Sequence, residues 1–130
     1  MNNQYGFGKT VSYSFDAALE KVTQALQKEG FGILTEIDTA ATIKKKLNID
    51  MPPYRILGAC NPQLAHAALE ADPSIGLLLP CNVVVRMDDK DKVFVEFMDP
   101  KVLMQLVNDA SIEKVANEVR QRLERVMNAL

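Results

Sequence analysis

The chain of 130 residues contains one histidine and two cysteines, and these scarcities exclude several kinds of site. His66 stands alone, without a placed base or carboxylate partner, so the sequence indicates neither a catalytic triad nor a histidine metal centre. Cys60 and Cys81 match no zinc spacing, no Cys-x-x-Cys redox motif and no disulfide-dense scaffold. The closely spaced glycines at 6 and 8 precede a predicted strand rather than a helix, unlike a dinucleotide loop. We therefore expect no metal and no cofactor.

Long runs of one charge and long apolar runs are also missing. The net charge is -2, and the single basic cluster, residues 44–46, is interpreted as a solvated helix face, so we expect no nucleic-acid partner. The longest apolar run, residues 77–85, is interrupted by Pro80 and Asn82 and is far shorter than the ~20 residues that span a bilayer. The first ten residues lack the apolar core of a signal peptide. We expect one domain over residues 1–130, no membrane contact and a cytoplasmic location.

The first half of the chain alternates between predicted strands and helices. Residues 9–15 alternate apolar and polar side chains, which predicts a half-buried strand. A helix capped by Ser14 or Asp16 follows and ends at Gly30, because glycine takes the left-handed conformation at low cost. We expect a strand over residues 31–38, a short helix over 39–47 and, after a proline-rich loop, a strand over 54–59.

The second half begins with a helix at Asn61-Pro62, where asparagine caps the helix and proline occupies its first position. That helix is expected to run to about Ala71. Residues 75–87 are predicted to be one extended run interrupted at Pro80, followed by a turn at 88–91 and a strand over 92–98. Two helices complete the chain, at 100–107 and from Ser111 onward. This order predicts an α+β fold, with a mostly antiparallel sheet of about five strands and helices packed on one face.

Candidate site residues gather at the two Cys-Asn pairs, 60–61 and 81–82, which are called the Cys-Asn corners below. Strand alternation places Cys81 toward the core, where free cysteine behaves as a small hydrophobe. Alternatively, a kink at Pro80 exposes Cys81 in a cleft, where a cation or a helix N-terminus lowers its pKa. Two groups near these corners could supply the positive charge, the Arg55 side chain and the start of the helix at Pro62. The candidate ligand-binding residues are Arg55, Cys60, Asn61, Cys81 and Asn82.

The strand over 92–98 is apolar on both faces, with Val93, Val95 and Phe97 on one and Phe94 and Met98 on the other. If helices cover one face, the second needs another partner. We therefore expect a homodimer formed through the sheet.

Several stretches resemble a known family, namely GFGILTEID, YRILGACNP, IGLLLPCNVVV and the Met-Asp-Pro that follows the last strand. They look like the domain of unknown function family 302, and the resemblance covers nearly the whole chain. It implies a compact α+β fold similar to the TATA-binding-protein-like arrangement, in small bacterial or archaeal proteins that are often dimers. It implies no established activity, so it assigns no catalytic residue. Nor does it imply DNA binding, against which the acidic charge balance also argues.

Two hypotheses for function remain. The first is a soluble, non-enzymatic dimer that binds a small molecule or a partner protein between the turn at 60–62 and the kink at 80–82. The second is a thiol-dependent enzyme or redox sensor that uses Cys81, activated by Arg55 or by the helix that starts at Pro62. The first hypothesis requires fewer placed groups, and we favour it. Both require the two Cys-Asn pairs to lie together in space.

Overall fold

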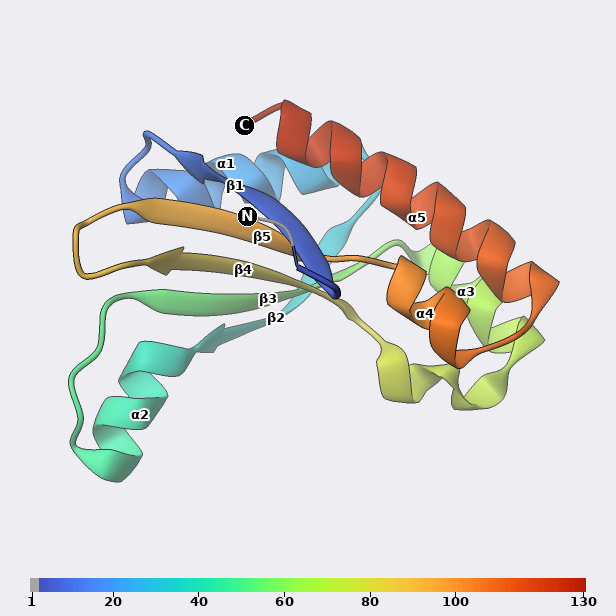
Figure 1. Cartoon of the computed structure of the whole chain (residues 1–130), viewed down its shortest axis with the longest axis horizontal. Helices are drawn as coiled ribbons and strands as arrows, with labels where there is room; N and C mark the ends of the chain where they lie inside the picture. The colour runs from blue at the N-terminus through green and yellow to red at the C-terminus, as the bar shows by residue number, and fades with distance from the viewer. Residues whose placement is uncertain (1–2) are drawn as a thin grey trace.

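The computed structural model describes residues 3–130 and contains one five-stranded sheet (Figure 1). Every neighbouring pair of strands is antiparallel, and the strand order is β1-β5-β4-β3-β2. The strands are β1 (Gly6–Val11), β2 (Gly32–Asp38), β3 (Tyr54–Cys60), β4 (Cys81–Met87) and β5 (Val93–Met98). The predicted α+β class with an antiparallel five-stranded sheet is confirmed.

Most of the helical segments lie on one face of the sheet or beyond one of its ends (Figure 1). Helices α1 (Phe15–Lys28) and α5 (Ala110–Asn128) pack on the sheet and on each other, as expected. Past the end of the sheet, α5 packs on a group formed by α3 (Pro62–Ala71), the 3-10 helix η1 (Pro73–Leu78) and α4 (Lys101–Leu106). Helix α2 (Thr39–Leu47) projects from the opposite end of the sheet and has no buried residue. In the part of the chain that the structure describes, no helix lies across the other face of the sheet (Figure 1).

The hydrophobic core consists of two clusters that share α5. The larger cluster lies between the sheet and helices α1 and α5, and includes Leu26, Val83, Phe97 and Leu123. The smaller cluster joins α3, η1, α4 and the first turns of α5 through Ala68, Ile75, Leu103, Ile112 and Ala116. Because α5 is amphipathic along its 19 residues, one helix can bury its apolar stripe against both clusters.

Most helix starts and stops follow the predicted capping chemistry. The side chains of Ser14, Asp38 and Asn61 accept hydrogen bonds from Ala17 N, Ala41 N and Leu64 N, which satisfies donors that the first turn leaves unpaired. Gly30 follows α1 with φ +84°, as expected for a glycine after a helix.

Three expectations about local structure are wrong. The first strand covers Gly6–Val11 instead of 9–15, because Gly6 to Val11 pair with Met98 to Val93 and α1 already begins at Phe15. Residues 73–78 form the 3-10 helix η1 rather than extended chain, because Asp72 caps a turn through Ser74 N and Ile75 is buried among α3 and α5. The last helix begins at Ala110, since Asp109 caps it and accepts from both Ser111 N and Ile112 N.

Candidate functional site

The two Cys-Asn pairs lie together where β3 ends and β4 begins. Ala59 pairs with Cys81 and Gly58 pairs with Asn82 in the antiparallel register, so Cys60 and Asn61 follow directly beside the start of β4. The peptide bond between Leu79 and Pro80 is cis, and it precedes this strand. The requirement that both corners meet in space is therefore met.

Beside these corners is a cavity of about 290 Å³. It lies at the junction of the two cores, because Phe31, Ala59 and Val119 belong to the larger cluster and Ala68 and Leu103 to the smaller one. Among residues 3–130, Asn61 is the one polar residue of its wall apart from the two thiols, and no charged side chain lines it. The remaining lining residues are Leu34, Leu64, Ala65, Leu69, Leu79, Pro80, Val115 and Ala116.

Exposed leucines on this wall mark the side on which the cavity meets solvent. The register between β2 and β3 shifts between Ile33 and Thr35, and Leu34, at this irregularity, is 67% exposed. Leu69 of α3 is 39% exposed and lines the same cavity. An apolar molecule that entered here would contact two side chains that are already in water, so the opening is itself apolar.

Alanines on the facing helices create the space. Ala65 and Ala68 on α3, together with Ala116 on α5, line the cavity with small side chains. A longer side chain at any of these positions would project into the hollow. The sequence does not reveal this hollow, because small residues on the inward face of a helix also allow helices to pack closely.

The two thiols differ in burial. Cys81 is 7% exposed, and burial, with a smaller contribution from nearby Cys60, raises the pKa of its thiol to about 11. Cys60 is half-buried on the same cavity wall. At neutral pH Cys81 is therefore a protonated thiol, which is a poor nucleophile.

Asn61 performs a structural task at the cavity wall. Its Oδ1 caps α3, and the residue is only 8% exposed. Its amide nitrogen lies so close to Gly30 that a Cβ built on Gly30 would be 2.8 Å away. Gly30 thus allows the end of α1 and the start of α3 to approach each other.

The other two candidate residues do not line the cavity. Arg55 is near the opposite end of β3, about 17 Å from Cys60 along an extended strand. Its guanidinium is paired with Glu36 at 2.8 Å and with Asp38 at 3.3 Å, so the structure does not bring it to either thiol. Asn82 is exposed on the open face of the sheet, which is opposite to the face of Cys81.

Within residues 3–130 there is no group of three or more His, Cys, Asp or Glu side chains arranged to hold a metal ion. In the same part of the chain, every helix is too short or too polar to cross a bilayer.

Comparison with known proteins agrees with this architecture. The model of a family described as "Domain of unknown function DUF302" matches residues 7–130. This chain belongs to the DUF302 family. A crystal structure of an uncharacterized conserved DUF302 protein from Bacillus stearothermophilus has a TM-score of 0.89 and 26% sequence identity, covering 98% of each chain. No curated protein matches the sequence. The resemblance and the fold are confirmed, and the DUF302 family carries no known function.

Proposed function

We propose that this DUF302 protein is a binding module that takes up a small, uncharged, apolar molecule in the cavity between α3, α5 and the ends of β3 and β4. The observation that carries the proposal is a hollow of about 290 Å³ to whose wall the described part of the chain contributes no charged side chain. Largely apolar hollows of about this size that open to solvent and carry a few polar groups are the usual sites of small-molecule binding in proteins.

The size and chemistry of the cavity define the class of ligand. Its volume is about twice the roughly 150 Å³ of an engineered apolar cavity that binds benzene. A charged ligand would lose its hydration without gaining a partner, which is costly in an apolar environment. We therefore expect an aryl or short alkyl compound with at most one hydrogen-bonding group, which Asn61 or a thiol can meet.

The alternative, a thiol enzyme or redox sensor using Cys81, has less support. It requires a thiolate, and the raised pKa of the Cys81 thiol opposes one. Arg55 is paired with Glu36 and Asp38, so it is not available to activate that thiol. The two free thiols suit a reducing compartment, and we propose a cytoplasmic location on that ground.

Titration with toluene, followed by amide chemical shifts, tests the binding proposal. We expect saturable shifts at Ala65, Ala68 and Ala116. Ala68→Leu, which places three more carbons in the cavity, should weaken the binding at least tenfold. Ala67→Leu is the matched control, because Ala67 lies on the same helix but is exposed and does not line the cavity. If no shift saturates, or if both variants bind like the wild type, the proposal is wrong.

We also propose that a second copy of the chain covers the part of the open sheet face formed by β2, β3 and α2. A nine-residue helix is marginal in water alone, and α2 buries none of its side chains within the monomer. Large apolar side chains are exposed in and beside it, namely Ile37 (48%), Leu47 (61%) and Ile49 (53%). A two-fold contact through this surface would bury all three.

Sedimentation at micromolar concentration tests the dimer. The wild-type chain should sediment as a dimer and Ile37→Glu as a monomer. Leu77→Glu is the control, since Leu77 is 89% exposed but lies on η1, beyond the other end of the sheet. A wild-type monomer at high micromolar concentration would exclude the dimer.

A further inference from the structure

A second hollow, separate from the apolar cavity, lies on the open face of the sheet over β1, β5 and β4. Its volume is about 630 Å³, and it shares no residue with the cavity beside the cysteines. Unlike that cavity, it contains charged side chains, and both signs are present. The residues on which the argument rests are Tyr54, Asn82, Val84, Arg86, Glu96 and Met98.

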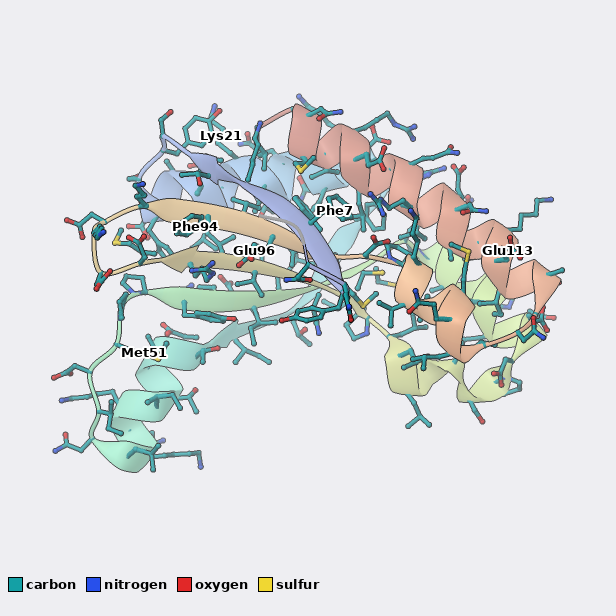
Figure 2. All side chains as sticks on the ribbon, viewed as in Figure 1. Phe7, Lys21, Met51, Phe94, Glu96 and Glu113 are labelled. Atoms are coloured by element: carbon teal, nitrogen blue, oxygen red, sulfur yellow. The ribbon has the colours of Figure 1, made fainter. Side chains whose placement is uncertain are left out.

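A cross-strand ion pair lies in the wall of this hollow. Arg86 Nε on β4 lies 2.6 Å from Glu96 Oε1 on β5, and the two side chains are 30% and 25% exposed. The guanidinium carbon is 4.4 Å from the centre of the Phe94 ring, so the aromatic ring helps to fix its position. Phe94 and Glu96 lie along β5 in Figure 2. The pair is therefore held in place before any ligand arrives.

Hydrogen-bonding capacity remains on both members of the pair. Only Nε of Arg86 and Oε1 of Glu96 take part in the hydrogen bonds formed by these side chains within residues 3–130. The two Nη groups can donate to a carboxylate in the planar, paired geometry that arginine favours. Glu96 Oε2 can accept from an ammonium group. A positive and a negative anchor thus lie side by side in one hollow.

Glycine at position 8 preserves this arrangement on the neighbouring strand. Gly8 pairs with Glu96, and a Cβ built on Gly8 would lie 2.8 Å from Glu96 Cα and 3.1 Å from Glu96 Cγ. The same Cβ would overlap the backbone oxygen of Val95, so any larger residue would shift the strand that carries Glu96. Backbone strain does not explain this glycine, since its φ is not in the left-handed region; close approach to Glu96 and its strand does.

We propose that this hollow binds a small zwitterion, of which an α-amino acid with an apolar side chain is the simplest example. Its carboxylate would take the Nη donors of Arg86, and its ammonium group would donate to Glu96 Oε2. Val84 and Met98 offer apolar contact for the side chain, and Asn82 and Tyr54 lie in the same wall. A ligand with a single charge could pair with only one of these two side chains. It would then compete with the existing ion pair between Arg86 and Glu96, so a good match requires both charges.

Titration of the ¹⁵N-labelled chain with L-leucine, isoamylamine and 4-methylvalerate tests the class of ligand. The three probes share a branched apolar body, and only leucine carries both charges. We expect saturable amide shifts at residues 82–86 and 94–98 with leucine, and a response at least tenfold weaker with either singly charged probe. Equal responses to all three, or no saturation with leucine at 20 mM, would overturn the proposal.

Variants of the pair separate this site from general surface binding. Arg86→Gln and Glu96→Gln should each weaken leucine binding at least tenfold. Arg55→Gln removes an arginine from the same sheet but from outside the hollow, and should leave the affinity unchanged. The thermal midpoint of each variant verifies that it is folded. If the folded Arg86→Gln variant binds leucine as well as the wild type does, the assignment of this hollow is wrong. Toluene binding in the apolar cavity is measured separately, and its outcome does not bear on the leucine site.

Discussion

The ring of Pro80 lies directly against Gly58, so that a Cβ built on Gly58 would be 2.9 Å from Pro80 Cγ and would also overlap Thr35 Oγ1. Gly58 is therefore the residue that lets the segment before β4 pass close over β3. Because Pro80 lines the apolar cavity, this contact also fixes one part of the cavity wall.

We predict that Gly58→Ala lowers the free energy of unfolding by about 1–3 kcal/mol, because overpacking at this contact must move the proline or the threonine. Urea denaturation followed by circular dichroism measures the change. Gly32→Ala is the matched control on the adjacent strand, since a Cβ there has no heavy atom within 4 Å, and its stability should be unchanged or slightly higher. Equal losses for the two variants would show that crowding by Pro80 and Thr35 is not the cause.

The start of α5 provides a second prediction. Asp109 Oδ1 accepts from Ser111 N at 2.8 Å and from Ile112 N at 3.3 Å, so Asp109→Ala should cost about 1 kcal/mol. Ser111→Ala should cost less than about 0.5 kcal/mol, because residue 111 lies inside the helix and is exposed. Thermal denaturation of both variants compares the two positions. A larger loss for Ser111→Ala would place the helix start where the sequence alone predicted it.

Local chemistry explains why many element boundaries could be predicted. Asn61-Pro62 and Gly30 each have a conformational preference that depends on the residue itself, and the structure places them at helix ends as expected. The first strand was misplaced because its pairing depends on β5. Gly6 and Gly8 give no strand signal, whereas the stacking of Phe7 on Phe97, with ring centres 5.6 Å apart, exists only in the folded sheet.

The candidate site, like the fold, could be predicted from the sequence only in part. The meeting of the two Cys-Asn corners follows from the antiparallel register of β3 and β4, which the predicted antiparallel sheet allows although α3 and η1 separate the two strands in the chain. The cavity itself depends on how α3 and α5 are spaced over the strand ends, which no residue in the sequence specifies alone. Likewise, an apolar run such as residues 75–79 is compatible with either a strand or a buried helical turn, and only packing against α3 selects η1.

Arg120 links three elements and yields a third prediction. Its guanidinium pairs with Asp99 before α4 and lies 4.4 Å from the ring centre of Phe7 on β1, which Figure 2 shows beneath α5. Both charged side chains are largely buried, at 22% and 15% exposed. Asp99→Ala leaves the arginine without this partner and should cost about 1–3 kcal/mol in urea denaturation.

A surface ion pair provides the control for that measurement. His66 and Glu70 form an i,i+4 pair on α3 with side chains 76% and 70% exposed, so Glu70→Ala should change stability by less than about 0.5 kcal/mol. If Asp99→Ala lowers the free energy of unfolding as little as Glu70→Ala does, Arg120 is held by its aromatic contact and by Glu124 instead.

The pH dependence of stability tests the state of Cys81. Burial raises the pKa of this thiol from 9.0 to about 11 in the folded chain, so the unfolded chain loses the proton first as the pH rises. The thiol's contribution is fully present below about pH 9 and is lost as the pH passes through 11. Two pKa units correspond to about 3 kcal/mol.

We expect the stability difference between the wild type and Cys81→Ala to shift by up to about 3 kcal/mol between pH 8 and pH 11, to the disadvantage of the wild type. Urea titrations of both proteins at each pH measure this difference in the free energy of unfolding. Because lysines and tyrosines titrate in both proteins, their contributions cancel in the difference. In the native protein at pH 7.5, a thiol reagent should leave Cys81 unmodified until the chain unfolds. Rapid modification of Cys81 under those conditions would mean that its thiolate is accessible, and the thiol-enzyme hypothesis would then displace the binding module.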